Sequence, residues 1–170
     1  EKTPSVESSV ELGGVMHSLV PVNDNQLLGI GNMVEPAGEG GSSEYGFKLV
    51  LLDVSSENAK ITDSFETDAY NLTTWYETNI DLFVDSENHA YATAVAFMDE
   101  QGYWNGDGLL KFRINNNHFE INEDTDEFYN EYVEGCYNAG NIEIGNYIYS
   151  FSVNNSNEQH GFIISVHKYK

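Results

Sequence analysis

Basic residues are scarce in this chain of 170 residues, because seven Lys and Arg stand against 28 Asp and Glu. The formal net charge is therefore −21. So few cations cannot neutralise a row of phosphates, which excludes nucleic acid as the natural partner. The same balance argues against docking on an anionic membrane surface. No apolar run approaches the roughly 20 residues that span a bilayer, so we expect no membrane insertion.

Cysteine is almost absent, since Cys136 is the only one, and no disulfide can form within the chain. Its neighbours Glu134 and Tyr137 include no cation to stabilise a thiolate. We therefore expect Cys136 to be a small apolar residue of a strand.

Sequence motifs typical of an enzyme or of a cofactor site are also missing. The sequence contains no Gly-x-Ser-x-Gly and no phosphate-binding glycine loop. The five histidines are scattered without metal-ligand spacing: His17, His89, His118, His160 and His167. We expect no cofactor, and the chain more closely fits a protein without catalytic activity.

Short β-branched and aromatic runs fill most of the chain, separated by Asn, Asp, Gly and Ser. This pattern predicts strands joined by tight turns, and hence antiparallel sheets. The predicted strands are 17–22, 27–34, 47–54, 60–67, 80–84, 90–98, 108–114, 119–122, 141–144, 147–153 and 161–169.

The strands recur as a unit. In the first unit, a strand and a turn lead into a second strand that begins at Leu27. The same arrangement precedes the strands that begin at Ala90 and Tyr147. The third strand of each unit opens with a glycine, at Gly46, Gly108 and Gly161. Four-stranded antiparallel units in tandem are typical of β-propeller blades, and a two-sheet sandwich is the rival interpretation.

The predicted fold is thus all-β, a propeller segment of about three four-stranded blades in an incomplete ring. Residues 1–8 form a flexible N-terminal segment, and residues 9–170 form the domain, with blades at about 15–68, 73–125 and 133–170. Residues 6–12 read as a lone strand of a preceding blade. An open edge invites pairing, so we expect a homodimer by edge-strand exchange, or upstream blades of the same protein.

Three segments resemble a family of secreted bacterial proteins with a C-terminal β-propeller distantly related to WD-40 repeats. The segments are Leu19–Gly31, Phe47–Ser55 and Gly140–Tyr149. The resemblance implies a propeller fold and a secreted or cell-surface bacterial location, but no reaction. Two places depart from the family pattern, because Val20 stands where it has histidine before proline, and Thr78-Asn79 stands where it has Asp-His ahead of the strand.

The long loops should gather at one end of a propeller, where binding residues tend to lie. They are predicted at 35–45, 69–78, 99–106, 128–138 and 154–160. Aromatic and acidic side chains concentrate there, and such a mixture suits a carbohydrate or protein ligand. The candidate binding residues are Trp75, Tyr76, Glu77, Tyr103, Trp104 and Tyr137.

Two other possibilities follow from the acidic residues. The segment Asp99–Asp107 is rich in oxygen donors and could hold a structural Ca²⁺, although its spacing is not that of an EF-hand. Alternatively, Asp81 and Glu143 could act as axial carboxylates of a glycan-cleaving hydrolase. The function we expect is a non-catalytic binding or scaffold module.

Overall fold

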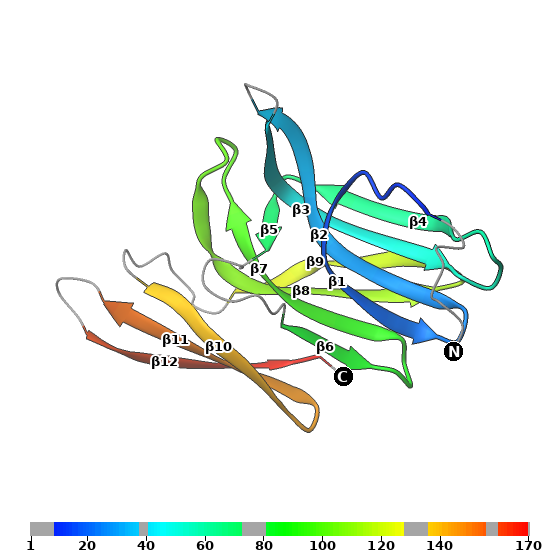
Figure 1. Cartoon of the computed structure of the whole chain (residues 1–170). Helices are drawn as coiled ribbons and strands as arrows, with labels where there is room; N and C mark the ends of the chain where they lie inside the picture. The colour runs from blue at the N-terminus through cyan, green and yellow to red at the C-terminus, as the bar shows by residue number, and fades with distance from the viewer. Residues whose placement is uncertain (1–8, 38–40, 73–80, 128–135, 156–159, 170) are drawn as a thin grey trace, which may run out of the picture.

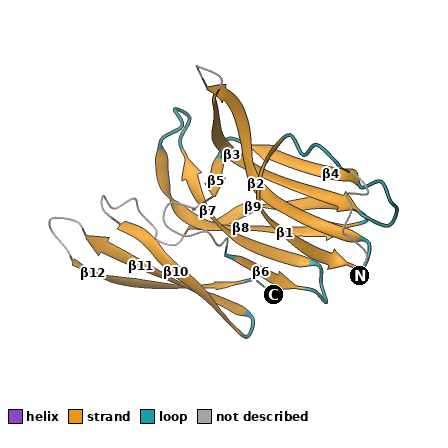
Figure 2. Ribbon diagram, in the orientation of Figure 1, coloured by secondary structure: helices purple, strands orange, loops and turns teal. Residues whose placement is uncertain are grey.

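The computed structural model describes residues 9–37, 41–72, 81–127, 136–155 and 160–169. The described residues form three antiparallel sheets and no helix (Figures 1 and 2). The prediction of an all-β chain of tandem antiparallel units is confirmed, and the sheets do not close into a ring. No described helix is long and apolar enough to cross a membrane.

Sheet A is a four-stranded meander in the order β1-β2-β3-β4. Its strands are β1 (Gly14–Asn23), β2 (Gln26–Ala37), β3 (Gly41–Asp53) and β4 (Lys60–Thr67). The turn between β1 and β2 is set by Asn23, whose Oδ1 accepts a hydrogen bond from the Asn25 N–H at 2.9 Å.

Sheet B has the same strand order as sheet A, but two short strands take the place of its first strand. β5 (Tyr70–Leu72) and β6 (Leu82–Asp85) both pair with β7 (Ala90–Met98), which continues to β8 (Trp104–Asn115) and β9 (His118–Glu127). Asn116 and Asn117 both have positive φ at the β8–β9 turn, as a tight hairpin requires. The sequence did not predict β5.

Sheet C has three described strands in the order β10-β11-β12. These are β10 (Cys136–Ile144), β11 (Tyr147–Asn155) and β12 (His160–Lys168). Cys136 therefore lies in a strand, as its sequence context predicts. Sheet C differs from the other two sheets because no described strand pairs with the outer edge of β12.

The sheets stack in the order A, B, C, with sheet B in the middle (Figure 1). One core cluster joins Leu28 and Leu49 of sheet A to Tyr91 and Leu110 of sheet B. A second cluster lies on the opposite face of sheet B. It joins Phe83, Ala92, Ala94 and Leu109 to Ile148 of sheet C. Burial of both faces explains why β7 is a nearly continuous apolar strand.

The hairpins correct the sequence alignment of the units. The first hairpin closes on the pair Asn23–Gln26, whereas the others close on Asp85–Ala90 and Ile144–Tyr147. Gln26, not Leu27, is thus equivalent to Ala90 and Tyr147. A shift of one residue exchanges the two faces of a strand. With this correction, equivalent residues of the three sheets face in the same direction along the stack.

The same alignment corrects one of the glycines, because Gly46 and Gly161 correspond to Gly106 and not to Gly108. Gly46 has φ +60° at a bulge in β3, and an added Cβ would meet Met33 Cε at 2.3 Å. Gly106 has φ +124° at the matching bulge in β8. A bulge with positive φ favours glycine, so sheets A and B have a glycine bulge at equivalent positions.

Several predicted loops are shorter than expected, because the strands continue into them. In the predicted loop 35–45, Glu35 pairs with Ser43 and Ala37 with Gly41. β5 lies in the predicted loop 69–78, and β8 begins at Trp104 within the loop 99–106. The loops at 128–138 and 154–160 likewise lose residues to β10, β11 and β12. Alternation alone did not reveal the extensions of β2 and β3 at residues 35–36 and 41–45, which are exposed.

The lone strand predicted at residues 6–12 lies only partly within the described residues. Residues 9–12 form no strand, and residues 1–8 lie outside the described residues. β1 begins only at Gly14.

Candidate functional site at the seam of sheets B and C

The tip of the β7–β8 hairpin is held by Asp99. Its Oδ1 accepts hydrogen bonds from the N–H groups of Gln101, at 2.9 Å, and Tyr103, at 2.8 Å. The Asp99 N–H donates to the Tyr103 carbonyl at 2.8 Å, and Gly102 adopts φ +80° between them. The tip is thereby fixed while the Tyr103 side chain stays 72% exposed. Because the turn is already fixed, contact of the exposed ring with another molecule would require little further loss of conformational entropy.

Trp104 follows directly and lies half-buried beside the bulge. Its indole Nε1–H donates to Asp107 Oδ1 at 2.9 Å. The bulge at Gly106 allows this contact, because the extra residue brings Trp104 and Asp107 together on one strand.

Asp107 also connects sheet B to sheet C. Its second oxygen, Oδ2, accepts a hydrogen bond from the Asn138 N–H of β10 at 3.2 Å. The side-chain amides of Asn138 and Asn141 bond each other, at 3.0 and 3.2 Å. Asn141 Nδ2 then donates to Asp81 Oδ2 at 2.7 Å. Asp81 lies just before β6. We call these residues, Trp104, Asp107, Asn138, Asn141 and Asp81, the seam network.

Burial sets the acid–base behaviour of the seam network. Asp107 is 6% exposed, and burial raises its pKa above the usual 3.8, because the carboxylate has lost water. The bonds from Trp104 and Asn138 act in the opposite direction but more weakly. A buried carboxylate with a raised pKa beside an exposed aromatic tip is a candidate functional residue.

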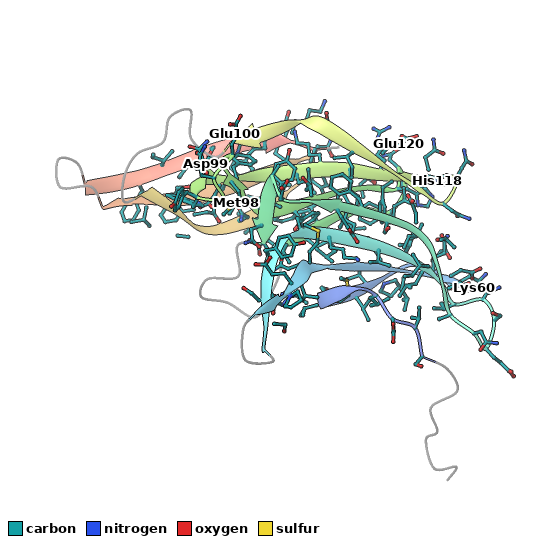
Figure 3. The ribbon with its side chains drawn as sticks, turned by 90° about the horizontal axis from the view of Figure 1, so that it is seen from above. Lys60, Met98, Asp99, Glu100, His118 and Glu120 are labelled. Atoms are coloured by element: carbon teal, nitrogen blue, oxygen red, sulfur yellow. The ribbon has the colours of Figure 1, made fainter. Side chains whose placement is uncertain are left out.

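The hairpin tip lies at the opposite end of the molecule from the short turns. Figure 3 shows Met98, Asp99 and Glu100 far from Lys60 and His118. At the short-turn end, Gln26 Nε2 donates to Asn117 Oδ1 at 2.8 Å, which joins the turns of sheets A and B. The antiparallel topology therefore separates a short-turn end from the end that carries Tyr103.

The structure places only part of the predicted site. Tyr103 and Trp104 are adjacent on the hairpin, as the sequence implies. Tyr137 lies in β10 next to Asn138, so its backbone is beside the seam network, although its side chain is outside the description. Trp75, Tyr76 and Glu77 lie outside the described residues, between β5 and β6.

The two proposed axial carboxylates lie on the same seam. Asp81 precedes β6 and bonds Asn141. Alternation places the exposed Glu143 on the face of β10 that carries Asn141. Within the described ranges, no group of three or more His, Cys, Asp or Glu residues could hold a metal ion. The Asp99 carboxylate in the proposed calcium segment instead binds backbone N–H groups.

Sequence reasoning missed the seam network as a unit. Asn138 and Asn141 lie in different chain regions from Asp81 and Asp107, and only the stacking of two sheets brings them together. The one available signal was an acidic residue next to the apolar run that begins at Leu109, as Asp107 is in β8.

The fold and its stacking define a class of protein built from tandem antiparallel sheets that pack face to face. A family model for the β-propeller domain matches residues 1–159, and the chain belongs to this family. No curated protein matches the chain. No solved structure matches it either.

Proposed function

We propose that this β-propeller domain is a non-catalytic binding or scaffold module of a secreted or cell-surface bacterial protein. The observation that carries the binding role is the fixed hairpin tip, which presents Tyr103 next to the half-buried Trp104. The bacterial and extracellular placement is supported by the sequence resemblance of Leu19–Gly31 and the two later segments.

The ligand we propose is a neutral carbohydrate. An exposed ring provides an apolar platform for a sugar face, and the exposed side chains of Glu100, Gln101 and Asn105 near the same tip offer partners for hydroxyl groups. A chain with a net charge of −21 repels anionic ligands, which favours a neutral one.

The experiment is a screen of the full chain against an array of neutral oligosaccharides, followed by titration of the strongest binder. Tyr103→Ala should weaken binding by roughly tenfold or more, because aromatic anchors dominate such sites. Tyr45→Ala is the matched control, since Tyr45 is an exposed tyrosine of β3 outside the seam network, and it should bind like the wild type. Failure to bind any glycan, or equal loss in both variants, would overturn the proposal.

A glycan-cleaving hydrolase is the second candidate, favoured by the position of Asp81 and Glu143 on one seam. Asp81→Ala and Glu143→Ala would abolish turnover of an enzyme but leave a binding module able to hold its ligand. Detection of reducing ends released from the bound glycan would decide in favour of the hydrolase.

A further inference from the structure

The outer face of sheet C, which points away from sheet B, is apolar. The register places Ile142, Tyr149 and Val166 side by side across this face. The ring centroids of Phe151 and Phe162 lie 5.1 Å apart on the same face, so the surface is continuous across the strands. The large apolar side chains of this face that are 39–71% exposed form what we call the sheet C patch: Ile142, Ile144, Tyr147, Phe151, Phe162, Ile164 and Val166.

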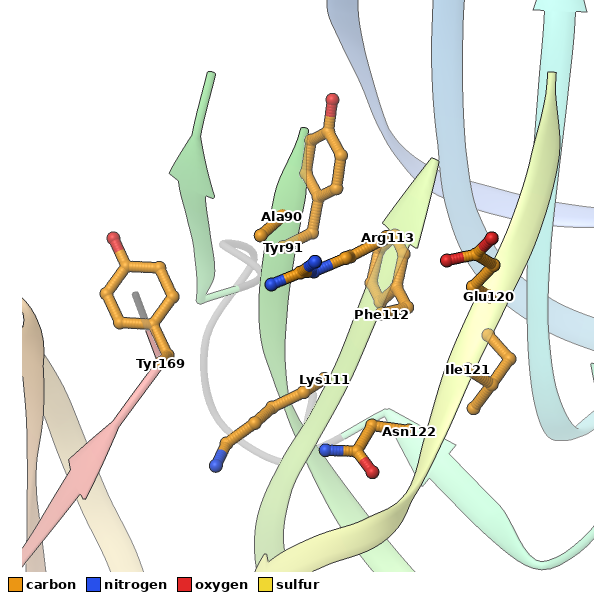
Figure 4. Close-up of a pocket in the computed structure, with 9 residues that line it drawn as sticks. All are labelled: Ala90, Tyr91, Lys111, Phe112, Arg113, Glu120, Ile121, Asn122 and Tyr169. Carbon is orange, nitrogen blue, oxygen red and sulfur yellow. The ribbon is translucent and has the colours of Figure 1, made fainter. Parts of the chain in front are cut away.

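Contacts on the other face of sheet C show which face points outward. Ile163 of β12 packs on sheet B, and the ring centroid of Tyr169, just after β12, lies 6.2 Å from that of Phe83. Figure 4 shows Tyr169 lining a groove of about 320 Å³ together with Lys111 of β8. Successive residues of a strand point to opposite faces, so Ile164, which follows Ile163, points away from sheet B.

The distribution of charge sets the sheet C patch apart in a chain with 28 acidic residues. Glu143 is the one Asp or Glu within β10, β11 and β12, and alternation places it on the inner face with Asn141. Lys168 lies at the margin of the outer face, where it pairs with Tyr147. These three strands therefore bring no carboxylate to the outer face, and a second acidic molecule can meet it without repulsion at the contact itself.

The sheet C patch has the size of a protein interface. A fully exposed large apolar side chain offers roughly 150–250 Å², so at these exposures the patch presents on the order of 700 Å². The largest apolar patch of a typical monomer is about 300–600 Å². A specific interface buries about 800 Å² on each partner, so this face alone supplies nearly what one side of a stable dimer needs.

The partner that fits this surface best is the same surface of a second copy. The other end of the stack, the outer face of sheet A, carries the ion pair of Lys48 with Glu66, whose side chain is 48% exposed. Covering that carboxylate with the sheet C patch would remove it from water at a cost in free energy. Two sheet C patches instead bring apolar side chains together, as the contacts of sheet B with sheets A and C do. We propose that two copies of this chain associate through their sheet C patches, face to face about a two-fold axis.

Sedimentation equilibrium of the full chain tests the proposal. At about 0.15 M salt, where charges are screened beyond about 8 Å, it should show monomer and dimer without larger species, because a contact between identical faces closes at two copies. Ile164→Glu should weaken dimerisation by roughly a hundredfold or more, since it buries an unpaired carboxylate from each copy. Ile164 is 64% exposed in the single chain, so the variant should stay folded, and hydrogen exchange of the β11 amides verifies this. The matched control is Ile61→Glu, the same change at a 41% exposed isoleucine of β4, which should dimerise like the wild type.

A measurement on the wild type identifies the face without any variant. In a mixture of isotope-labelled and unlabelled copies, filtered nuclear Overhauser effects should connect the methyl groups of Ile142 and Ile164 to the ring protons of Phe151 and Phe162 across the interface. A monomer at every concentration, a dimer insensitive to Ile164→Glu, or growth into larger species would overturn the proposal. Contacts between copies that run from the sheet C patch to sheet A, with equal weakening by Ile61→Glu, would also overturn it, because the association would then be head to tail. Glycan binding at Tyr103 is measured separately, so this proposal can fail without the proposed function.

Discussion

At the scale of single residues, burial in the seam network changes how Asp107 titrates. Its pKa is raised in the folded chain, so the folded state binds a proton more tightly than the unfolded state does. Ionised Asp107 therefore lowers stability, and this penalty grows as the pH rises from the unfolded value of 3.8 through the folded value.

The variant Asp107→Asn removes this titration. We expect the free energy of unfolding of the wild type, relative to that of the variant, to fall as the pH rises from about 4 to neutrality. Urea unfolding at several pH values measures the difference. The variant carries its own constant cost, because the amide cannot accept from both Trp104 and Asn138, so only the slope matters. Parallel stability curves would show that Asp107 titrates normally.

Lys48 is a second buried charge, on the opposite face of sheet A from the core shared with sheet B. Its side chain is 7% exposed, and its Nζ forms an ion pair with Glu66 and donates to the Gly13 carbonyl at 3.1 Å. Removal of the Glu66 charge leaves the buried ammonium with a neutral partner.

We therefore expect Glu66→Gln to lower the free energy of unfolding by about 2 kcal/mol, the usual cost of a lost bond to a charged group. In contrast, Lys48→Met should be nearly neutral, because an apolar side chain of similar size needs no partner. Denaturant titration compares the two variants. Equal costs for both would contradict this account of the pair.

At the scale of elements, Ile148 is the fully buried apolar contact of sheet C with sheet B, and Ile163 and Tyr169 pack beside it. Ile148 of β11 is fully buried against Phe83, Ala92, Ala94 and Leu109. The other inward side chains of β11, Ser150 and Ser152, are small and polar although buried. The contact of sheet C therefore depends strongly on Ile148.

The variant Ile148→Ala should lower the free energy of unfolding of sheet C by about 2–5 kcal/mol. Ile142→Ala is the control, since Ile142 of β10 is 60% exposed and should cost less than about 0.5 kcal/mol. Hydrogen exchange of β11 amides reports this sheet selectively. Equal protection in both variants would mean that sheet C does not pack on sheet B through Ile148.

Much of the element order was predictable, because strand residues and turn residues alternate clearly along the chain. β4 and β7 have the predicted limits of 60–67 and 90–98. The polar extensions of β2 and β3 were not predictable, since exposed hairpin arms show no apolar alternation. β5 was missed because three residues are too few to show a period.

The candidate site was less predictable than the fold. Tyr103 and Trp104 are neighbours in sequence, so their pairing needed no tertiary information. The hydrogen bonds of Asp107 to Asn138 and of Asn141 to Asp81 depend on stacking between sheets, which one sequence does not encode locally. The unit alignment failed by one residue at Leu27, because the turns differ in length.

At the scale of the whole molecule, the net charge of −21 opposes assembly of two copies. This repulsion is long-ranged and reaches about 30 Å at 0.01 M salt. We therefore expect the dimer fraction to rise between about 0.01 and 0.15 M salt. Sedimentation at both concentrations measures it, and a constant or falling fraction would show that repulsion is insignificant.

The central claim is that the three sheets stack in series, with sheet B between the other two. Methyl-to-methyl nuclear Overhauser effects measure this order directly. The account predicts contacts from Ile148 to Ala92, Ala94 and Leu109, and from Leu28 to Leu110, with none between Ile148 and Leu28. Contacts between Ile148 and Leu28 would contradict it, because sheets A and C would then face each other.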